Sequence, residues 1–85
     1  MVISIPQRLK TGIESIKKEI ENHLAKLEKD ISEDNLETAE YHSKEIEYSL
    51  IKEAEHKLNI LDQKDPDIEK YKQKLSNLRK KFHSD

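Results

Sequence analysis

Apolar residues recur along the first third of the chain at spacings that keep them on one side of an α-helix. Successive members lie three or four residues apart, and each has a counterpart eleven positions away: Ile5, Leu9, Ile13, Ile16, Ile20, Leu24, Leu27 and Ile31. An eleven-residue repeat corresponds to about 3.67 residues per turn, close to the natural period of the helix. The stripe predicts a long, nearly straight helix over residues 5–31, with its apolar side buried against another helix.

Two further segments carry the same kind of spacing. Residues 35–63 have a main apolar face with Leu58 and Ile60 on its shoulders, and the face consists of Leu36, Ala39, Ser43, Ile46, Leu50, Ala54 and Leu61. Residues 66–83 show a narrower seam with strict 3-4-3-4 spacing, formed by Ile68, Tyr71, Leu75, Leu78 and Phe82. Such a seam is typical of a helix that packs along one line against its neighbours.

Capping signals mark where each helix begins. Ser4 and Gln7 bracket Pro6 as a capping box, in which each side chain satisfies an orphan backbone N–H. Asp34–Glu37 reads as a second box, and Asp65 followed by Pro66 reads as an acidic cap with proline at the first helical position. The chain therefore divides into helices over 5–31, 35–63 and 66–83.

We expect one all-α domain over residues 1–85, because short connections favour antiparallel neighbours. The predicted architecture is an antiparallel up-down-up three-helix bundle, made of a long hairpin of the first two helices and a shorter third helix. The third helix is about ten residues shorter than the other two, so one end of the hairpin lacks a third wall. A second copy of the chain or a helical protein partner would close it.

Composition agrees with long, solvated helices. Of the 85 residues, 40% are charged and 33% are apolar, with one Gly, two Pro and no Cys. The regular apolar spacing argues against disorder, which so polar a chain would otherwise suggest. The lack of Cys excludes disulfides and thiol chemistry. The sequence begins without an apolar run typical of a signal peptide, and no later run is long enough to span a bilayer, so we expect a cytoplasmic location.

The net charge of −2 is unevenly distributed. Residues 32–63 carry three basic and nine acidic side chains, whereas residues 64–85 carry seven basic and four acidic ones. An acidic middle and a basic end favour packing of the chain on itself.

Three side chains are candidates for contact with another protein. Tyr41 and Tyr48 fall nearly opposite the main apolar face of the second helix, and Ile51 lies part-way round. Tyrosine offers a large contact area at low entropic cost, so we predict an interface at Tyr41, Tyr48 and Ile51. The alternative is that these are ordinary exposed side chains.

The basic side of the third helix is a candidate for binding anions. Lys70, Lys74 and Lys81 form one outward stripe, with Lys80 on its shoulder. Such a stripe binds phosphate in nucleic acid or at an anionic surface. We favour a solvated face whose cations complement the helix dipole, because aromatic residues do not interleave with this stripe.

Metal binding and catalysis have little support. Glu19, His23 and His42 fall at the same level of the hairpin, but histidine at a helix edge is usually structural, and we predict no metal site and no cofactor. The only glycine, Gly12, lies inside a helix, so there is no phosphate-binding loop or nucleophile elbow. We expect a non-enzymatic helical-bundle protein that self-associates through protein–protein contacts. The alternative is an accessory protein that binds nucleic acid or an anionic surface through its third helix.

Overall fold

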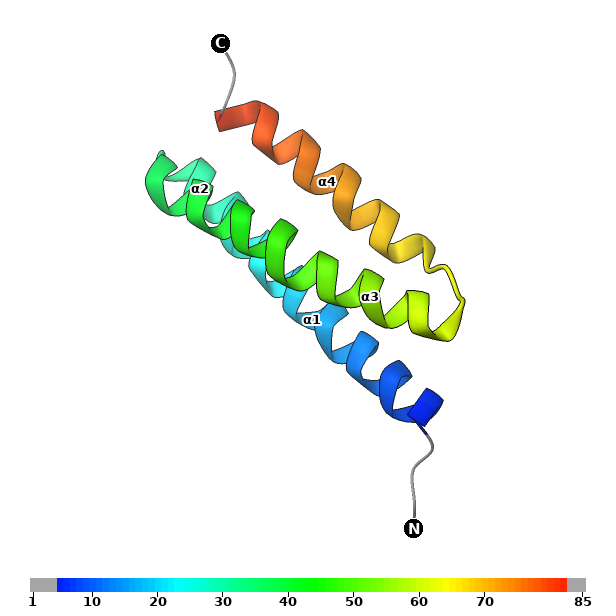
Figure 1. The fold of residues 1–85 in the computed structure, drawn as a ribbon. Coiled ribbons are helices and arrows are strands. Elements are labelled where there is room, and N and C mark those ends of the chain that lie inside the picture. Colours follow the sequence, from blue (N-terminus) through cyan, green and yellow to red (C-terminus); the bar gives the residue numbers. More distant parts are fainter. Residues whose placement is uncertain (1–4, 83–85) are drawn as a thin grey trace.

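The structure is a computed structural model that describes residues 5–82, and within this range it consists of helices that pack together (Figure 1). Helix α1 spans Ile5–Ser32. A second helical stretch is continuous from Leu36 and comprises α2 (Leu36–Glu45), the π-helical segment η1 (Ile46–Ile51) and α3 (Lys52–Leu61). Helix α4 spans Pro66–Phe82. The three predicted helices are therefore confirmed, and the second ends two residues earlier than expected.

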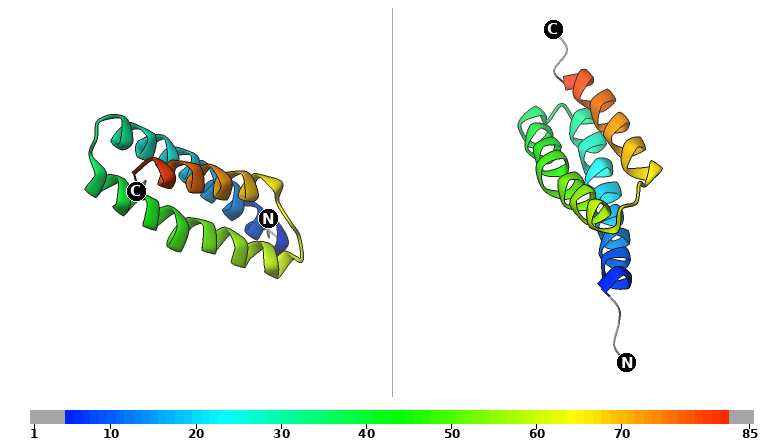
Figure 2. Two further views of the ribbon diagram at one scale, coloured as in Figure 1. Left: turned by 90° about the horizontal axis from the view of Figure 1, so that it is seen from above. Right: turned by 45° about the vertical axis from the view of Figure 1, so that its right-hand side comes forward.

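The helices form an elongated bundle with extents of 50 × 22 × 16 Å. Figure 2 shows α4 lying along both α1 and the second helical stretch. In Figure 1 and in the right-hand view of Figure 2, the first turns of α1 project beyond the other helices. The exposed side chain of Ile5 belongs to this projecting end. The end of the bundle that lacks a third wall is thus the one at the start of α1.

The core runs along the bundle and uses most of the apolar positions expected from the spacing, but Leu36, which was placed on the main apolar face, is 43% exposed. Helix α1 contributes Ile13, Ile16, Ile20, Leu24 and Leu27. The second stretch contributes Ala39, Ile46, Ile51, Ala54 and Leu58, and α4 contributes Ile68, Leu75 and Leu78. Tyr71 packs partly against this core, whereas the side chain of Phe82 lies outside the described part of the chain.

Helices α1 and α3 both end in a Schellman motif built on aspartate rather than glycine. Asp34 has φ 60°, and the N–H groups of Asn35 and Asp34 donate to the carbonyls of Asp30 and Ile31 at 2.8 and 3.1 Å. Asp62 has φ 53°, and the N–H groups of Gln63 and Asp62 donate to the carbonyls of Leu58 and Asn59 at 3.0 and 3.1 Å.

Of the three predicted N-terminal caps, one is confirmed, one is wrong and one lies outside the described residues. Asp65 Oδ1 accepts the backbone N–H of Asp67 at 2.9 Å, so the predicted cap of the third helix is confirmed. The predicted box at Asp34–Glu37 is wrong, because Asp34 adopts the left-handed conformation that ends α1, and the N-cap Asn35 makes no side-chain bond to the backbone. The box predicted at Ser4 lies outside the described residues.

The π-helical segment changes which residues of the second stretch face the core. A π-helix bonds residues five apart and so holds one more residue than the same length of α-helix would. Ile46 and Ile51, five residues apart, are both buried, and Leu50 is only partly buried. Ile51, which the spacing placed part-way round the helix and which we predicted as a contact residue, is only 2% accessible, because a uniform helical period does not hold across η1.

Candidate functional site

Two tyrosines lie on the outer side of α2 and η1, as the spacing predicted. Tyr41 is 64% exposed and Tyr48 is 60% exposed. The Tyr41 ring lies 5.8 Å from the His42 ring, and the Lys52 ammonium lies 5.4 Å from the centroid of the Tyr48 ring. We call Tyr41 and Tyr48 the tyrosine face. Ile51, the third predicted contact residue, does not join it because it is in the core, and the role of the tyrosine face in binding stays a prediction.

The basic helix α4 is turned toward the acidic residues of its neighbours. Lys72 Nζ lies 2.7 Å from Glu55 Oε2 and Arg79 Nη2 lies 2.6 Å from Glu47 Oε2. The hydrogen bond and charge of Arg79 hold the pKa of the Glu47 carboxyl below its ordinary value. Glu55 raises the pKa of Lys72 by the same kind of contact. The expected packing of a basic end on an acidic middle is therefore present.

The four lysines proposed for anion binding differ in their surroundings. Lys74 Nζ lies 2.6 Å from Glu28 Oε1, so its charge is offset by an acid of α1. Lys70, Lys80 and Lys81 are exposed on α4. Their exposure agrees with a solvated face, and anion binding by these residues stays a prediction.

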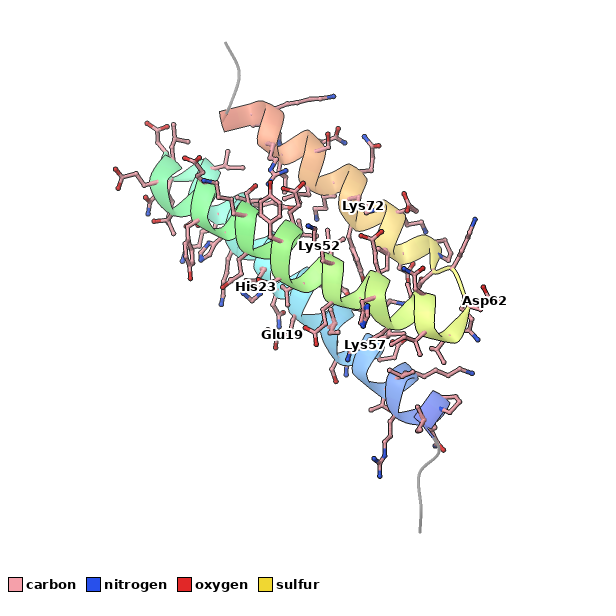
Figure 3. The ribbon with its side chains drawn as sticks, in the orientation of Figure 1. Glu19, His23, Lys52, Lys57, Asp62 and Lys72 are labelled. Carbon is pink, nitrogen blue, oxygen red and sulfur yellow. The ribbon has the colours of Figure 1, made fainter. Side chains whose placement is uncertain are left out.

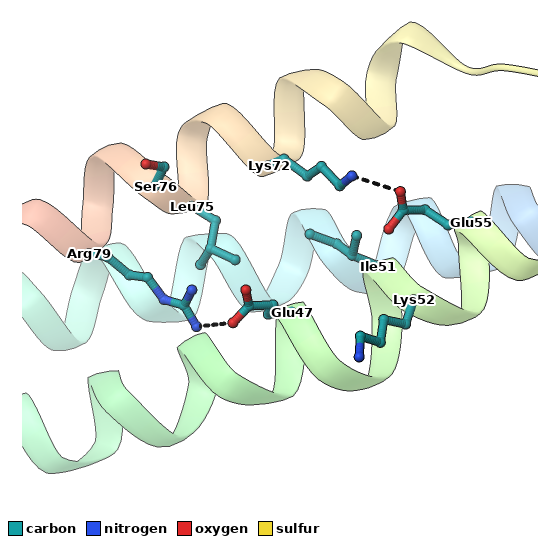
Figure 4. Close-up of a pocket in the computed structure, with 8 residues that line it drawn as sticks. All are labelled: Glu47, Ile51, Lys52, Glu55, Lys72, Leu75, Ser76 and Arg79. Atoms are coloured by element: carbon teal, nitrogen blue, oxygen red, sulfur yellow. Dashed lines mark hydrogen bonds and ion pairs between the residues drawn. The ribbon is translucent and has the colours of Figure 1, made fainter.

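A groove of about 440 Å³ opens between α4 and the η1–α3 part of the second stretch (Figure 4). Its apolar lining includes Ile51 and Leu75. Figure 4 shows Lys72 and Arg79 reaching from α4 to Glu55 and Glu47 on the opposite side. These four charged residues were missed by sequence reasoning, which placed α4 against the hairpin without fixing which cations meet which acids.

Arg79 also reaches the one polar side chain in the middle of the second helix's apolar face. Its Nε donates to Ser43 Oγ, and Ser43 is buried. Burial of the hydroxyl is tolerated because it is hydrogen-bonded. The sequence identified Ser43 only as a small residue of the apolar face.

The start of α4 is fastened to α1 by one lysine. Lys17 Nζ lies 3.0 Å from Asp65 Oδ2 and 2.7 Å from Asp67 Oδ2. The hydrogen bond that Lys17 donates to Asp67, with a further contribution from Asp65, raises the pKa of Lys17. Burial opposes ionisation of Asp65, but bonds from Lys17 and the Asp67 N–H outweigh it and lower the pKa of the Asp65 carboxyl.

Tyr71 adds a further link between α4 and α1. Its hydroxyl donates to Glu21 Oε2 at 3.0 Å. Burial of the phenol and this hydrogen bond to a carboxylate raise the pKa of Tyr71 to about 12. The groups with shifted pKa values serve to hold the helices together. Contacts with another element keep each of them in the protonation state that it has at pH 7.

The histidines come together as the sequence predicted, but each is paired with its own acid. The rings of His23 and His42 lie 6.2 Å apart, nearly perpendicular. His23 Nε2 lies 2.7 Å from Glu45 Oε1, and His42 Nδ1 lies 2.7 Å from Asp30 Oδ2. Figure 3 shows Glu19 and His23 along the same edge of α1. Residues 5–82 contain no group of three or more His, Asp or Glu side chains placed to hold a metal ion.

Within the described part of the chain, no helix combines the length and the apolar character needed to cross a bilayer. Comparison with known proteins gives no match to any family model, to any curated protein or to any solved structure.

Proposed function

We propose that the protein is a non-enzymatic helical-bundle protein that acts through protein–protein contacts and self-associates through the tyrosine face. The observation that carries the proposal is the exposure of Tyr41 and Tyr48, 64% and 60%, on the outer side of α2 and η1. Aromatic side chains that contribute little to their own core are typical anchors of protein interfaces.

The surroundings of the two rings support this role. Tyr48 has the Lys52 ammonium over its ring and Tyr41 lies beside His42, so each ring has a neighbour that restrains it before binding. A restrained aromatic side chain loses less conformational freedom when a partner covers it. The tyrosine face is thus better prepared for contact than the isolated exposed side chain Ile60.

We further infer that the bundle is antiparallel and runs up-down-up, which leaves the tyrosine face turned away from both neighbouring helices. The order of contacts along α1 supports this topology. Successive α1 residues meet falling residue numbers in the second stretch: Gly12 with Lys57, His23 with Glu45, and Asp30 with His42. They meet rising numbers at α4: Lys17 with Asp65, Glu21 with Tyr71, and Glu28 with Lys74.

The test is the molar mass in solution, measured by light scattering across a concentration series. We expect the mass to rise toward twice the 10.0 kDa of one chain. The double variant Tyr41→Ala, Tyr48→Ala is expected to remain a monomer at concentrations where the wild type is a dimer. Ile60→Ala is the matched control, because Ile60 is 57% exposed and lies outside the tyrosine face. A wild type that stays monomeric at high micromolar concentration contradicts the proposal, as does a double variant that associates normally.

A further inference from the structure

The tyrosine face continues into an exposed charged residue at each end. Glu37 lies one helical turn before Tyr41, and Lys52 lies one turn after Tyr48. Lys44, also exposed, lies between the two tyrosines. The Lys52 ammonium lies 5.4 Å from the centroid of the Tyr48 ring, so the order of these residues on one side of the helix holds across η1. We call the five residues the outer stripe, and in Figure 4 its member Lys52 points away from α4.

The two end charges of the outer stripe have no ion-pair partner in their own chain. Within residues 5–82, neither Glu37 nor Lys52 forms an ion pair. Lys44 Nζ, in contrast, lies 3.4 Å from Glu40 Oε1. Positions 37 and 52 lie roughly 22 Å apart along the helix axis, so the acid and the base cannot meet within one chain.

The spacing of the outer stripe is the same from either end. Glu37 stands as far before Tyr41 as Lys52 stands after Tyr48. If a second copy runs in the opposite direction, with a two-fold axis between positions 44 and 45, Tyr41 of each copy faces Tyr48 of the other. Glu37 of each copy then faces Lys52 of the other. Because every contact across a two-fold axis occurs twice, the pairing joins four tyrosines and forms two ion pairs.

Pairing of the same faces in a parallel orientation brings like charges together. Each residue would then face its own counterpart, so Glu37 would meet Glu37 and Lys52 would meet Lys52. Like charges placed opposite one another disfavour association. The antiparallel orientation keeps only one contact of this kind, that of Lys44 near the two-fold axis, and Glu40 offsets the charge of Lys44 within each copy.

We propose that two copies pair antiparallel through the outer stripe, and that Glu37 and Lys52 select this orientation. The inference rests on the self-association through the tyrosine face proposed above, and it names the residues that orient the two copies. Exposed ion pairs contribute little affinity each, so the tyrosines supply most of the affinity and the end charges decide between the two orientations.

The first experiment reverses the end charges of the full chain and measures dimerisation by light scattering at low salt. Glu37→Lys and Lys52→Glu are each expected to weaken the dimer about tenfold, because each change turns two attractive contacts into repulsive ones. The double variant Glu37→Lys, Lys52→Glu restores both pairs with exchanged signs. It is expected to dimerise within about threefold of the wild type. Circular dichroism checks that each variant keeps its helical content.

Two charge reversals outside the outer stripe are the matched controls. Glu69→Lys on α4 and Lys26→Glu on α1 make the same changes in net charge at exposed positions. Both are expected to dimerise like the wild type. In roughly 1 M salt, where the Debye length is about 3 Å, the differences among all variants are expected to disappear. Single reversals without effect, a double variant as weak as the single ones, or controls that are equally weakened each overturn the proposal.

Cross-linking tests the orientation directly, because the chain contains no cysteine. Lys44→Cys and Glu37→Cys are made as separate variants and treated with a short bis-maleimide at concentrations where each is a dimer by mass. In the antiparallel pair, the two copies of position 44 lie beside the axis, whereas the two copies of position 37 lie roughly 22 Å apart. We expect at least tenfold more cross-linked dimer from Lys44→Cys. Comparable yields mean a parallel pair or random collision and overturn the proposal, as does the lack of a cross-link at position 44.

The outcomes separate this proposal from the previous one. A wild type that stays monomeric removes both. A dimer that Tyr41→Ala, Tyr48→Ala abolishes, but that the double charge reversal does not restore, overturns the antiparallel orientation and leaves self-association through the tyrosine face standing.

Discussion

Replacement of Ile51 by alanine tests whether the π-helical segment sets the phase of the second helical stretch. Ile51 is 2% exposed and belongs to the core, together with Ile46 and Ala54. A buried Ile→Ala change removes apolar contact area and leaves a cavity, at a cost of about 2–5 kcal/mol. Ile51 borders the groove beside α4, where neighbouring side chains have room to move inward. We therefore expect a loss near the middle of the range, about 3 kcal/mol.

Urea unfolding followed by circular dichroism measures this loss. For a slope of about 1.5 kcal/mol per molar urea, the midpoint is expected to fall by about 2 M. Leu50→Ala serves as the comparison, because Leu50 is only partly buried and truncation there removes less contact. A continuous α-helix without a π-helical segment would reverse the order, with Leu50 in the core and Ile51 outside. A loss below about 1 kcal/mol for Ile51→Ala, together with a larger loss for Leu50→Ala, would refute the π-helical phase.

Four further predictions concern stability. Gly12→Ala is expected to stabilise the protein by about 0.5–1 kcal/mol in thermal or urea unfolding, because alanine favours the helix over glycine. The added Cβ fits, since it would lie 3.5 Å from Lys57 Cε, an ordinary contact with a flexible side chain. A destabilised variant would mean that α1 and α3 are closer than described. Asp62→Gly is expected to raise the free energy of unfolding by about 1 kcal/mol, and Asp62→Asn, which removes the charge and keeps a side chain, should recover only part of that gain. Because the pKa of Tyr71 is raised to about 12, its contribution is complete below pH 10 and is lost as pH rises toward 12, so alkaline unfolding curves of Tyr71→Phe should lack this component. On the acid side, the lowered pKa of Glu47 makes its contribution complete above its ordinary pKa of 4.5 and lost as pH falls below it, and Glu47→Gln should show a smaller loss of stability in acid than the wild type.

The apolar spacing was sufficient to predict the three helices and most of the core. Helical periodicity is a local property, and it placed Ile20, Leu27 and Leu75 correctly because each helix has one dominant buried side. It also placed Tyr41 and Tyr48 outside. Tyr41 precedes η1, where the helical period changes, and Tyr48 lies early in η1.

Sequence reasoning failed where the outcome depends on a local departure from regular helix geometry or on how two helices pack. Ile51 was misplaced because the sequence does not show where a helix takes an extra residue. Asp34 was assigned to the start of one helix, whereas its left-handed backbone ends the helix before it. The pairing of Lys72 and Arg79 with Glu55 and Glu47 depends on the relative shift of two packed helices, which periodicity does not determine.

The extra residue in η1 makes this segment the natural place for the chain to vary in length. Removal of Ser49, which is exposed, would bring Ile46 and Ile51 from five to four positions apart, the spacing of an ordinary α-helix. The faces of α2 and α3 would then remain aligned without a π-helical turn. A single-residue deletion elsewhere in the second stretch would instead rotate everything after it by about 100°. Related chains of different length, or shortened variants made in the laboratory, should therefore tolerate the loss of a residue at 46–51 far better than at other positions of this helix.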